Sequence, residues 1–445
     1  MTNNSPDQGG LKATLGLRSV ILFGLAYMTP IIVLGIFGVI AEASSGASAG
    51  AYLLASVAML FTASSYARMS VLHPVAGSSY TYVRRSLDSR AGFLVGWVVL
   101  LDYLFLPLVI WLIGASYLNS QFPSVPSAIW VLVFVVITTI LNIIGLKVAD
   151  KANLVLMAMQ VLVIAAFVML AVLHLLGKGG PGSLIGSAPL TGSGGFSAVA
   201  AGAAIAAYSF LGFDAVSTLT EDTKDPQRTI PRAILAVAVI GGALFFVTSY
   251  VLSLVEPGAS FTNADSLASD TARTIGGSLF ASLFLAGLVI GQFTSGLAAQ
   301  ASVSRLMYAM GRDGALPQSF FGRLDARWAT PVLNVVLTGV IGLGAIFLDV
   351  ATSTSFINFG AFTAFTLVNI ACISHFIRHR GQGLSFVWFV VVPAIGALVD
   401  LYLLTKLDGK ALSLGFIWLA IGFAYLAFLT RGFTQKPPEM TNAHS

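Results

Sequence analysis

Charged side chains are scarce in this sequence. Asp, Glu, Lys and Arg make up 9% of its 445 residues and apolar residues make up 57%, whereas a soluble protein of ordinary composition has about 25% charged residues. The mean hydropathy is +0.89, and runs long enough to cross a hydrocarbon layer of about 30 Å recur along the chain. The composition therefore argues against a soluble protein and predicts an all-α, polytopic protein of the lipid bilayer.

Residues that commonly build catalytic or metal centres are also scarce. Cys372 is the only cysteine, which excludes an intrachain disulfide or a cysteine metal cluster. The sequence has no HExxH, CxxC or Walker loop motif, and none of its five histidines lies deep within an apolar run. These absences argue against an enzyme and predict neither a cofactor nor a definite metal site. A voltage-sensor arginine series and a filter-like repeat are absent too, which argues against a channel.

Twelve apolar runs predict transmembrane helices. They lie at residues 19–40, 51–71, 91–118, 128–146, 153–176, 196–219, 232–255, 279–303, 331–348, 354–376, 385–404 and 412–430. An even number of spans places both ends of the chain on one side of the membrane. Of the 23 Lys and Arg residues, all except Lys178, Arg273, Lys406 and Lys410 then fall on that side.

This charge bias is the positive-inside pattern, which predicts that both termini are cytoplasmic. The net charge of +5 follows from this topology and indicates no nucleic-acid partner. We expect one membrane domain at 19–430 between short cytoplasmic tails at 1–18 and 431–445. The first dozen residues are polar and lack a cleavable signal pattern, so the first span is expected to remain as a helix. The oligomeric state cannot be inferred from the sequence.

Two of the predicted spans contain helix breakers at matching positions. Span 1 has Pro30 followed by Gly35 and Gly38, and span 6 has Gly212 beside Asp214. Proline and glycine are common in membrane helices, so each break alone is weak evidence. Their pairing in two successive five-span halves, about 19–176 and 196–376, is typical of secondary transporters with inverted repeats and a site near the membrane midplane. The backbone groups freed at such breaks can coordinate a ligand or an ion.

Two carboxylates lie well inside predicted spans, Asp102 in span 3 and Asp214 in span 6, with no Lys or Arg at comparable depth. A buried charge without a fixed partner costs several kcal/mol. Either the carboxylates bind a mobile cation, such as a coupling ion or an organic amine, or they stay protonated in hydrogen bonds between helices. Asp400 is closer to a span end, and we expect it to reach the interface in a structural role.

The stretch FLGFDAVSTLTEDTKDPQRTIPRAI (210–234) resembles the sixth helix and following loop of the amino acid–polyamine–organocation transporters. ASVSRLMYAMGRDGALP (301–317) and ATPVLNV (329–335) resemble the same family after helix 8 and at the entry to helix 9. The resemblance covers essentially the whole chain. It implies the LeuT-like fold of twelve helices, in which a five-plus-five inverted repeat has discontinuous helices 1 and 6. The last two helices, about 385–430, then lie outside the repeat.

Within that family the sequence is most similar to bacterial putrescine importers. The shared stretches are LAYMTP (25–30), AGSSYTYVRRS (76–86), GFLVGWVVLLDYLFLP (92–107) and INFGAFTAFTLVN (357–369). The resemblance implies a symporter of the bacterial inner membrane and a substrate site at the two helix breaks, with residues 27–31 and 209–213 as the unwound segments that line it. The site residues carried over, together with nearby aromatic and acidic candidates, are Tyr27, Met28, Thr29, Pro30, Ile31, Asp102, Tyr103, Tyr208, Ser209, Gly212, Phe213 and Asp214. Tyr208 falls where the family places an aromatic gate over the substrate.

The first break departs from the amino acid permeases of this family. They usually have a Gly-Ser-Gly-like element there, whose free amides hold a substrate carboxylate, whereas this chain has Pro30, which lacks the amide. Fewer amide donors and two membrane carboxylates favour a small cationic amine, such as putrescine. Aromatic residues near them can add cation–π contacts of about 0.5–2 kcal/mol each. An amino acid permease of the same family is the close alternative. An amine sensor that does not transport is a distant one.

The coupling ion is harder to predict. In some proton-coupled family members a lysine of helix 5 replaces a sodium ion, and the corresponding residue here is the uncharged Gln160. Thr294 and Ser295 in span 8 are candidate sodium ligands, or they satisfy contacts between helices. A negative-inside potential already favours cation import by about 2.3 kcal/mol per charge per 100 mV. We expect proton coupling, with sodium as the alternative.

Overall fold

The computed structural model describes residues 15–74, 78–144, 150–220, 222–258, 260–312, 314, 316–328 and 330–437. The side chains of residues 150–154 and 309 are outside this description. Most of both expected tails, 1–18 and 431–445, also falls outside the described residues. The described part is almost entirely helical, and its single isolated β-bridge joins Leu15 to Thr223.

The helical elements follow one another through the chain. They are α1 (Leu17–Met28), α2 (Ile32–Gly35), α3 (Phe37–Ala43), α4 (Ser48–Leu72), α5 (Ser78–Ser86), α6 (Ser89–Gln121), α7 (Ser127–Ile144), α8 (Asp150–Gly179), η1 (Gly180–Leu184), α9 (Ala188–Thr191), α10 (Gly195–Ala206), η2 (Ala207–Phe210), η3 (Ala215–Leu219), α11 (Pro226–Val255), η4 (Ala264–Ser266), α12 (Leu267–Arg312), α13 (Gln318–Phe321), α14 (Val332–Gly342), η5 (Leu343–Phe347), α15 (Val350–Arg378), η6 (Val387–Val391), α16 (Val392–Leu404) and α17 (Gly409–Leu429).

Helix lies at the position of each of the twelve predicted spans. Within the described residues, eleven helical segments are long and apolar enough to cross a membrane. The segment at the predicted ninth span, Val332–Phe347, is apolar but shorter. The structure therefore confirms an all-helical, multi-pass architecture and both interrupted spans, with eleven full-length candidates instead of twelve.

Aspartate side chains fix where three of the long helices begin. Asp88 accepts a hydrogen bond from the backbone N–H of Arg90 at the start of α6. Asp349 caps α15 in the same way, and Asp408 accepts from two backbone N–H groups at the start of α17. The first N–H groups of a helix have no partner within it, so a side-chain acceptor at this position typically stabilises the helix by about 1 kcal/mol.

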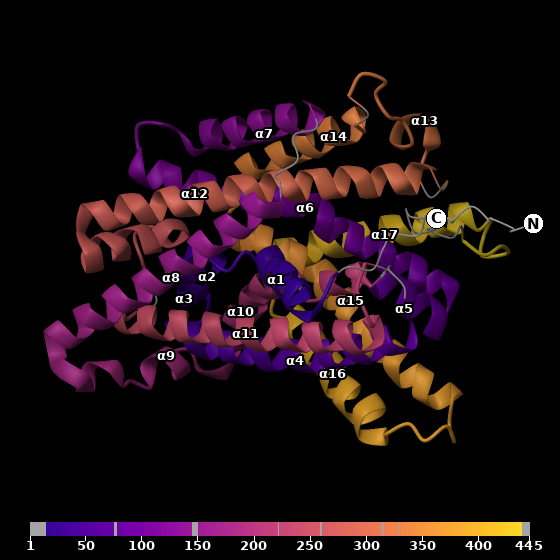
Figure 1. Ribbon diagram of the computed structural model, residues 1–445, viewed down its shortest axis with the longest axis horizontal. Coiled ribbons are helices and arrows are strands. Elements are labelled where there is room, and N and C mark those ends of the chain that lie inside the picture. Colours follow the sequence, from indigo (N-terminus) through magenta and orange to yellow (C-terminus); the bar gives the residue numbers. More distant parts are fainter. Residues whose placement is uncertain are drawn as a thin grey trace, which may run out of the picture.

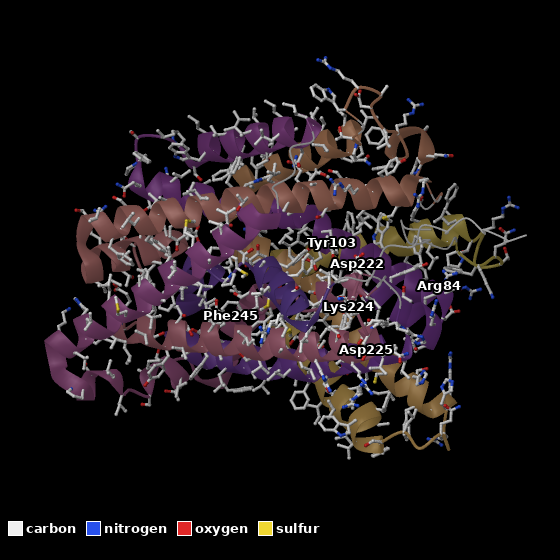
Figure 2. All side chains as sticks on the ribbon, viewed as in Figure 1. Arg84, Tyr103, Asp222, Lys224, Asp225 and Phe245 are labelled. Carbon is white, nitrogen blue, oxygen red and sulfur yellow. The ribbon has the colours of Figure 1, made fainter. Side chains whose placement is uncertain are left out.

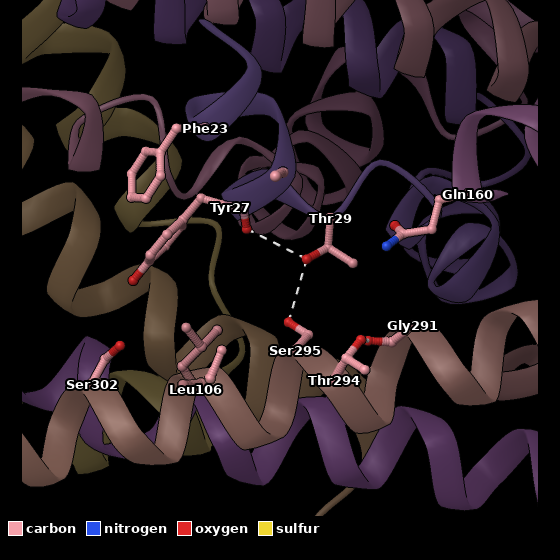
Figure 3. A pocket seen from close by; sticks show the side chains of 12 residues that line it. Phe23, Tyr27, Thr29, Leu106, Gln160, Gly291, Thr294, Ser295 and Ser302 are labelled. Atoms are coloured by element: carbon pink, nitrogen blue, oxygen red, sulfur yellow. Dashed lines mark hydrogen bonds between the residues drawn. The ribbon is translucent and has the colours of Figure 1, made fainter. Parts of the chain in front are cut away.

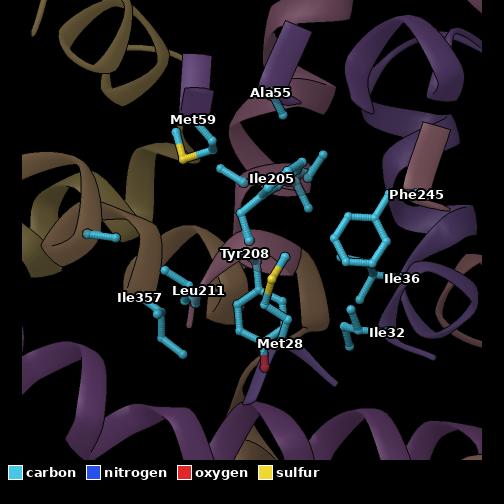
Figure 4. Close-up of a cluster of buried hydrophobic side chains, with 14 of the residues drawn as sticks. Met28, Ile32, Ile36, Ala55, Met59, Ile205, Tyr208, Leu211, Phe245 and Ile357 are labelled. Carbon is cyan, nitrogen blue, oxygen red and sulfur yellow. The ribbon is translucent and has the colours of Figure 1, made fainter. Parts of the chain in front are cut away.

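The short broken segments lie inside a bundle of long helices. In Figure 1, α7, α12 and α14 run along one side of the molecule, α4 and α11 run along the other, and α1, α2 and α10 lie between them. Residues of the breaks pack into the main core, where Tyr208, Met28 and Ile32 lie close to Leu211 and Phe245 (Figure 4). The interrupted spans are thus enclosed by continuous ones, which is where irregular backbone is tolerated in a membrane protein.

The outer surface is apolar over the middle of the long helices. Large apolar side chains more than a third exposed occur in rows on α7, α8 and α17, among them Ile137, Ile140, Leu162, Met169, Ile417 and Phe423. Such a broad exposed apolar surface would aggregate in water, so it indicates a surface that faces lipid. Arg84, Lys224 and Asp225 lie together in the right half of the molecule in Figure 2.

The connections between helices gather into two groups. In the first, the backbone of Leu15 pairs with Asp222 and Lys224 at 3.0 and 2.9 Å. Arg90 donates to the carbonyl of Phe433, and Arg378 to that of Leu87. These contacts join the segment before α1 to the segment after η3, and the segment between α4 and α6 to the segments after α15 and α17.

The second group contains the segments after α3, α6, α9, α11 and α16. The N–H of Ser193 donates to the carbonyl of Ser45 at 3.0 Å, and the Lys406 Nζ donates to the Ser197 Oγ at 2.9 Å. The Arg273 side chain donates to Gln121 Oε1. Alternate connections thus meet at alternate ends of the bundle, as an antiparallel succession of spans requires.

Asp400 does not reach the interface, contrary to the sequence-based expectation. It is fully buried, and its Oδ2 accepts hydrogen bonds from Thr62 Oγ1 at 2.7 Å and from Asn369 Nδ2 at 3.1 Å. These contacts join α16 to α4 and α15. The structure therefore indicates that Asp400 has a structural role, as expected. The expectation of an interfacial position failed because depth along a helix does not determine which way the side chain faces.

Candidate functional site

The first break occupies three residues between α1 and α2. Thr29 adopts the left-handed conformation with φ +49°, which ends α1, and Pro30 has no N–H to continue it. The N–H of Ile31 donates to Gln160 Oε1 on α8 at 3.5 Å. The hydroxyl of Thr29 lies 3.3 Å from that of Ser295 on α12. Side chains from two other helices thus contact the groups at this break.

Tyr27 and Met28, which the sequence places in an unwound segment at 27–31, still belong to α1. The break is therefore shorter than expected. The left-handed residue at Thr29, one position before the proline, is enough to terminate the helix.

The second break begins with a tight helical turn. η2 covers Ala207–Phe210, and the chain then runs irregularly through Gly212, whose φ is +125°, before η3 begins at Ala215. This backbone conformation is one that side-chain-bearing residues rarely adopt. A Cβ at Gly212 would lie 2.7 Å from Tyr27 Cδ1 and 3.2 Å from the backbone nitrogen of Met28. The two breaks therefore pack directly on each other.

Asp214 follows this break and contacts it. Its Oδ1 accepts a hydrogen bond from the N–H of Gly212 at 3.3 Å, and its side chain is partly exposed. Asp102, also partly exposed on α6, lies close enough to Asp214 for the two carboxylates to interact electrostatically. Among the described residues, no Lys or Arg contributes to the surroundings of either carboxylate. The structure thus brings together two acidic groups without a cation.

Tyrosines surround these two acids. The side chains of Tyr27 and Tyr103 lie close together, and Tyr27 lies within electrostatic reach of both Asp102 and Asp214. Tyr208 lies within reach of Asp102. Figure 2 places Tyr103 inside the bundle. The resulting cluster combines two carboxylates with three aromatic rings, which is a favourable environment for an organic cation.

Two connected cavities lie beside this cluster. The smaller, of about 30 Å³, is lined by residues of both breaks, α6 and α12, including Tyr27, Thr29, Tyr208, Gln292 and Ser295. The larger, of about 210 Å³, is shown in Figure 3 between α1 and α12, with Gln160 at one edge. Neither carboxylate is among the residues that line these two cavities.

The larger cavity contains all three candidate ion-coupling residues. Gln160, Thr294 and Ser295 line it together with Thr29. Thr294 Oγ1 donates to the carbonyls of Ile290 and Gly291 in its own helix. The cavity extends along α12 as far as Ser302 and along α1 back to Phe23. It therefore runs from the breaks toward the end of the bundle where Leu15 contacts the 222–224 segment.

Two of the expected site residues point into the protein core instead. Ser209 is 1% exposed, and its Oγ lies 3.1 Å from the Tyr52 hydroxyl on α4. Phe213 is fully buried and packs on the rings of Tyr66 and Phe365. Pro30 and Ile31 are also buried. These side chains shape the breaks without lining either cavity.

Gln292 is a cavity residue that the sequence reasoning missed. It lines the smaller cavity, is 1% exposed, and its buried Nε2 has no hydrogen-bond partner among the described residues. A buried amide donor that lacks an acceptor costs about 1–3 kcal/mol, which makes it a candidate contact for a polar ligand. The signal in the sequence was a lone amide deep in an apolar run, two residues before Thr294.

Comparison with known proteins gives relatives over nearly the full length. The low-affinity putrescine importer PlaP of Escherichia coli K12 is 40% identical over 434 residues, which cover 96% of each chain. The methylthioribose transporter of Bacillus subtilis is 29% identical over 435 residues, covering 93% of this chain and 92% of the relative. The branched-chain amino acid permease BcaP of the same organism is 26% identical over 450 residues, covering 95% and 94%.

A family model also matches most of the chain. The model for amino acid permeases covers residues 19–401, which include both breaks, both carboxylates and all the cavity-lining residues. Permeases and transporters, not enzymes, are the proteins to which this chain is similar. The chain therefore belongs to the amino acid permease family and is a multi-pass membrane transporter.

Proposed function

We propose that this transporter imports a polyamine such as putrescine across the bacterial cytoplasmic membrane. The observation that carries the proposal is the pairing of Asp102 and Asp214 inside the bundle, without a cation and among tyrosines. A diamine has two ammonium groups, so each carboxylate can take one. Similarity to an importer named for putrescine supports the same substrate class.

The surroundings of the first break favour an amine over an amino acid. Pro30 has no N–H, and the N–H of Ile31 already donates to Gln160. Few backbone amides therefore remain to hold a substrate carboxylate at this break. An amino acid remains the alternative substrate, since a relative at 26% identity is named as a branched-chain amino acid permease.

We infer that transport proceeds by alternating access in a twelve-span, five-plus-five inverted repeat. The repeats would be about 19–176 and 196–376, followed by two helices at about 385–430, in one domain at 19–430. The interrupted spans at equivalent positions support this arrangement. The two groups of connections support an even number of spans, and the excess of Lys and Arg in the first group supports cytoplasmic termini. The larger cavity then leads from the site toward the cytoplasm.

The proposal also assigns roles to Tyr208 and to the candidate ion-coupling residues. Tyr208 lines the smaller cavity and lies within electrostatic reach of Asp102, and would cover the bound substrate. We propose proton coupling, because a titratable carboxylate pair is present and Gln160 has no charge. A sodium ion bound among Thr29, Thr294 and Ser295 is the alternative.

Uptake into proteoliposomes tests the function directly. Purified protein is reconstituted and given labelled putrescine or each of a panel of amino acids, with a proton gradient or a sodium gradient imposed separately. We expect putrescine to accumulate with the proton gradient and the sodium gradient to have little effect. Transport of alanine or another amino acid with no putrescine uptake would overturn the substrate assignment, and uptake driven by sodium alone would reverse the ion assignment.

A further inference from the structure

An apolar groove lies on the outside of the bundle, apart from the transport cavities. Its volume is about 320 Å³, and it lies between the last turns of α4, the first turns of α11 and the segment that leads into α16. Most of its wall is apolar, including Val71, Leu235, Leu384 and Phe389. Val71 and Leu235 are 41% and 37% exposed. The groove therefore belongs to the surface that faces lipid, at the end of the bundle where Lys and Arg are concentrated.

A single cationic side chain, Arg68, lines this groove. Its guanidinium carbon lies 4.6 Å from the centre of the Trp388 ring and 5.5 Å from that of Phe389. Its Nε is buried and has no hydrogen-bond partner, and within the described part of the chain no carboxylate pairs with it. Arg68 is partly exposed and lines the groove, so its terminal N–H groups can donate to an anion bound there.

We propose that the groove binds an anionic phospholipid of the cytoplasmic leaflet. The phosphate accepts hydrogen bonds from the edge of Arg68, and an acyl chain lies along the apolar wall. Guanidinium and phosphate form strong, charge-assisted pairs, and a phosphate would supply the anion that the guanidinium lacks within the described part of the chain. Trp388 is 47% exposed beside Arg68, and tryptophan is enriched at the level of lipid headgroups. Anionic lipids are attracted to basic groups on this side of a membrane.

Charge and shape together favour a lipid over a free anion. Inorganic phosphate satisfies Arg68 but leaves the apolar wall of the groove exposed. A zwitterionic lipid covers the wall, but the cation of its own headgroup offsets the charge of its phosphate and weakens the attraction to Arg68. Only a lipid whose headgroup has a net negative charge matches both parts of the site.

Native mass spectrometry and thermal unfolding in detergent test this proposal. The full-length protein is titrated with dioleoyl phosphatidylglycerol, dioleoyl phosphatidylcholine or inorganic phosphate. We expect the phosphatidylglycerol to bind more tightly than the phosphatidylcholine and to raise Tm more, and phosphate alone to have no effect. Because one basic residue near an anionic lipid contributes about fivefold in affinity, Arg68→Gln should weaken phosphatidylglycerol binding by about fivefold or more.

Two further variants separate the parts of the site. Leu235→Trp fills the apolar wall while keeping Arg68, and should weaken the binding of both lipids; it also serves if Arg68→Gln does not fold. Arg323→Gln makes the same charge change at an exposed position outside the groove, and should leave the preference for phosphatidylglycerol intact. Equal binding of the two lipids by the unaltered protein, an unchanged preference in Arg68→Gln, or an equal effect of inorganic phosphate would overturn the proposal.

Discussion

At the scale of single residues, the two site carboxylates differ in what holds them. Asp214 accepts a hydrogen bond from the backbone of its own break through Gly212, which ties it to the geometry of the interrupted helix. Asp102 is placed by a continuous helix, α6, and lies within electrostatic reach of Asp214, Tyr27 and Tyr208. A substitution of Asp214 would therefore disturb the fold of the site as well as substrate binding. A substitution of Asp102 reports more directly on the contact with the substrate.

Asp102→Asn is expected to reduce putrescine uptake selectively. Removing the charge from one end of the diamine loses a charge-assisted hydrogen bond, worth about 1.5–3 kcal/mol, so kcat/KM should fall by about 10- to 100-fold. Uptake of a monoamine, which needs one carboxylate, should fall much less. Kinetics in proteoliposomes measure both substrates, and Asp225→Asn at an exposed position is the matched control. Equal losses for both substrates would remove the argument for a diamine.

His73 should make the protein less stable in acid. It lies just after α4, and burial, with Arg85 and His375 nearby, lowers its pKa from 6.5 to about 4. Between pH 6.5 and 4 the unfolded chain therefore binds the proton that the folded protein excludes, so stability falls as the pH drops through this window.

The comparison of unaltered protein with His73→Gln isolates this effect. Tm measured in detergent should fall from pH 6.5 to 4 in both proteins, because other groups titrate as well, but less steeply in the variant. His73 Nε2 lies 3.3 Å from Ser86 Oγ, a contact that glutamine can partly retain. Parallel Tm curves across this range would show that His73 does not carry the dependence.

At the scale of elements, the site depends on the contact between the two breaks. Gly212, in the second break, lies against Tyr27 at the end of α1 with no room for a side chain. The neighbouring continuous helices then secure each break, α8 through Gln160 and α12 through Ser295. A change in the conformation of one break must therefore change the packing of the other.

Gly212→Ala should abolish most transport and lower Tm. Its Cβ would clash with Tyr27, and its φ of +125° is strained for alanine, so we expect destabilisation of about 1–3 kcal/mol. Gly177→Ala on α8 is the control, since nothing lies within 4 Å of its Cβ position and alanine is the better helix former. Uptake and thermal unfolding report the result. Normal uptake by Gly212→Ala would contradict the close packing of the breaks.

At the scale of the whole molecule, an apolar outer surface lies between two groups of connecting segments. One group contains the Leu15 bridge and the Arg90 and Arg378 contacts, and the other contains the Lys406 and Arg273 contacts. The proposed topology assigns the first group to the cytoplasm. This assignment also fixes the direction of the larger cavity and the leaflet that supplies the lipid to the groove at Arg68.

Cysteine labelling tests the assignment in intact cells. Ser124, between α6 and α7, and Ala326, between α13 and α14, are both exposed, and the proposed topology places them on opposite sides of the membrane. A maleimide reagent that cannot cross the inner membrane should label Ser124→Cys in intact cells, and Ala326→Cys only after lysis. Cys372 is buried, so the unaltered protein serves as the unlabelled control. The reverse pattern would invert the topology.

The membrane class, the positions of the spans and the two breaks were determined by the sequence alone. Each rests on a local property: an apolar run of sufficient length, a proline without an N–H, or a glycine that permits an unusual φ. These properties act within one segment and need no knowledge of its neighbours. The extent of the first break was predicted less accurately. The expected unwound segment was 27–31, but Tyr27 and Met28 remain helical and the break is confined to Thr29–Ile31.

The arrangement of the site was decided only by the tertiary structure. Which face a helix turns inward depends on packing between segments far apart in the chain. That packing brought Asp102 toward Asp214, turned Ser209 toward Tyr52, and buried Asp400 against Thr62 and Asn369. It also placed Gln292 in a cavity and Arg68 beside Trp388. The depth of a residue in the membrane follows from its position along one helix. Its contact partners depend on how several helices are rotated and packed against each other.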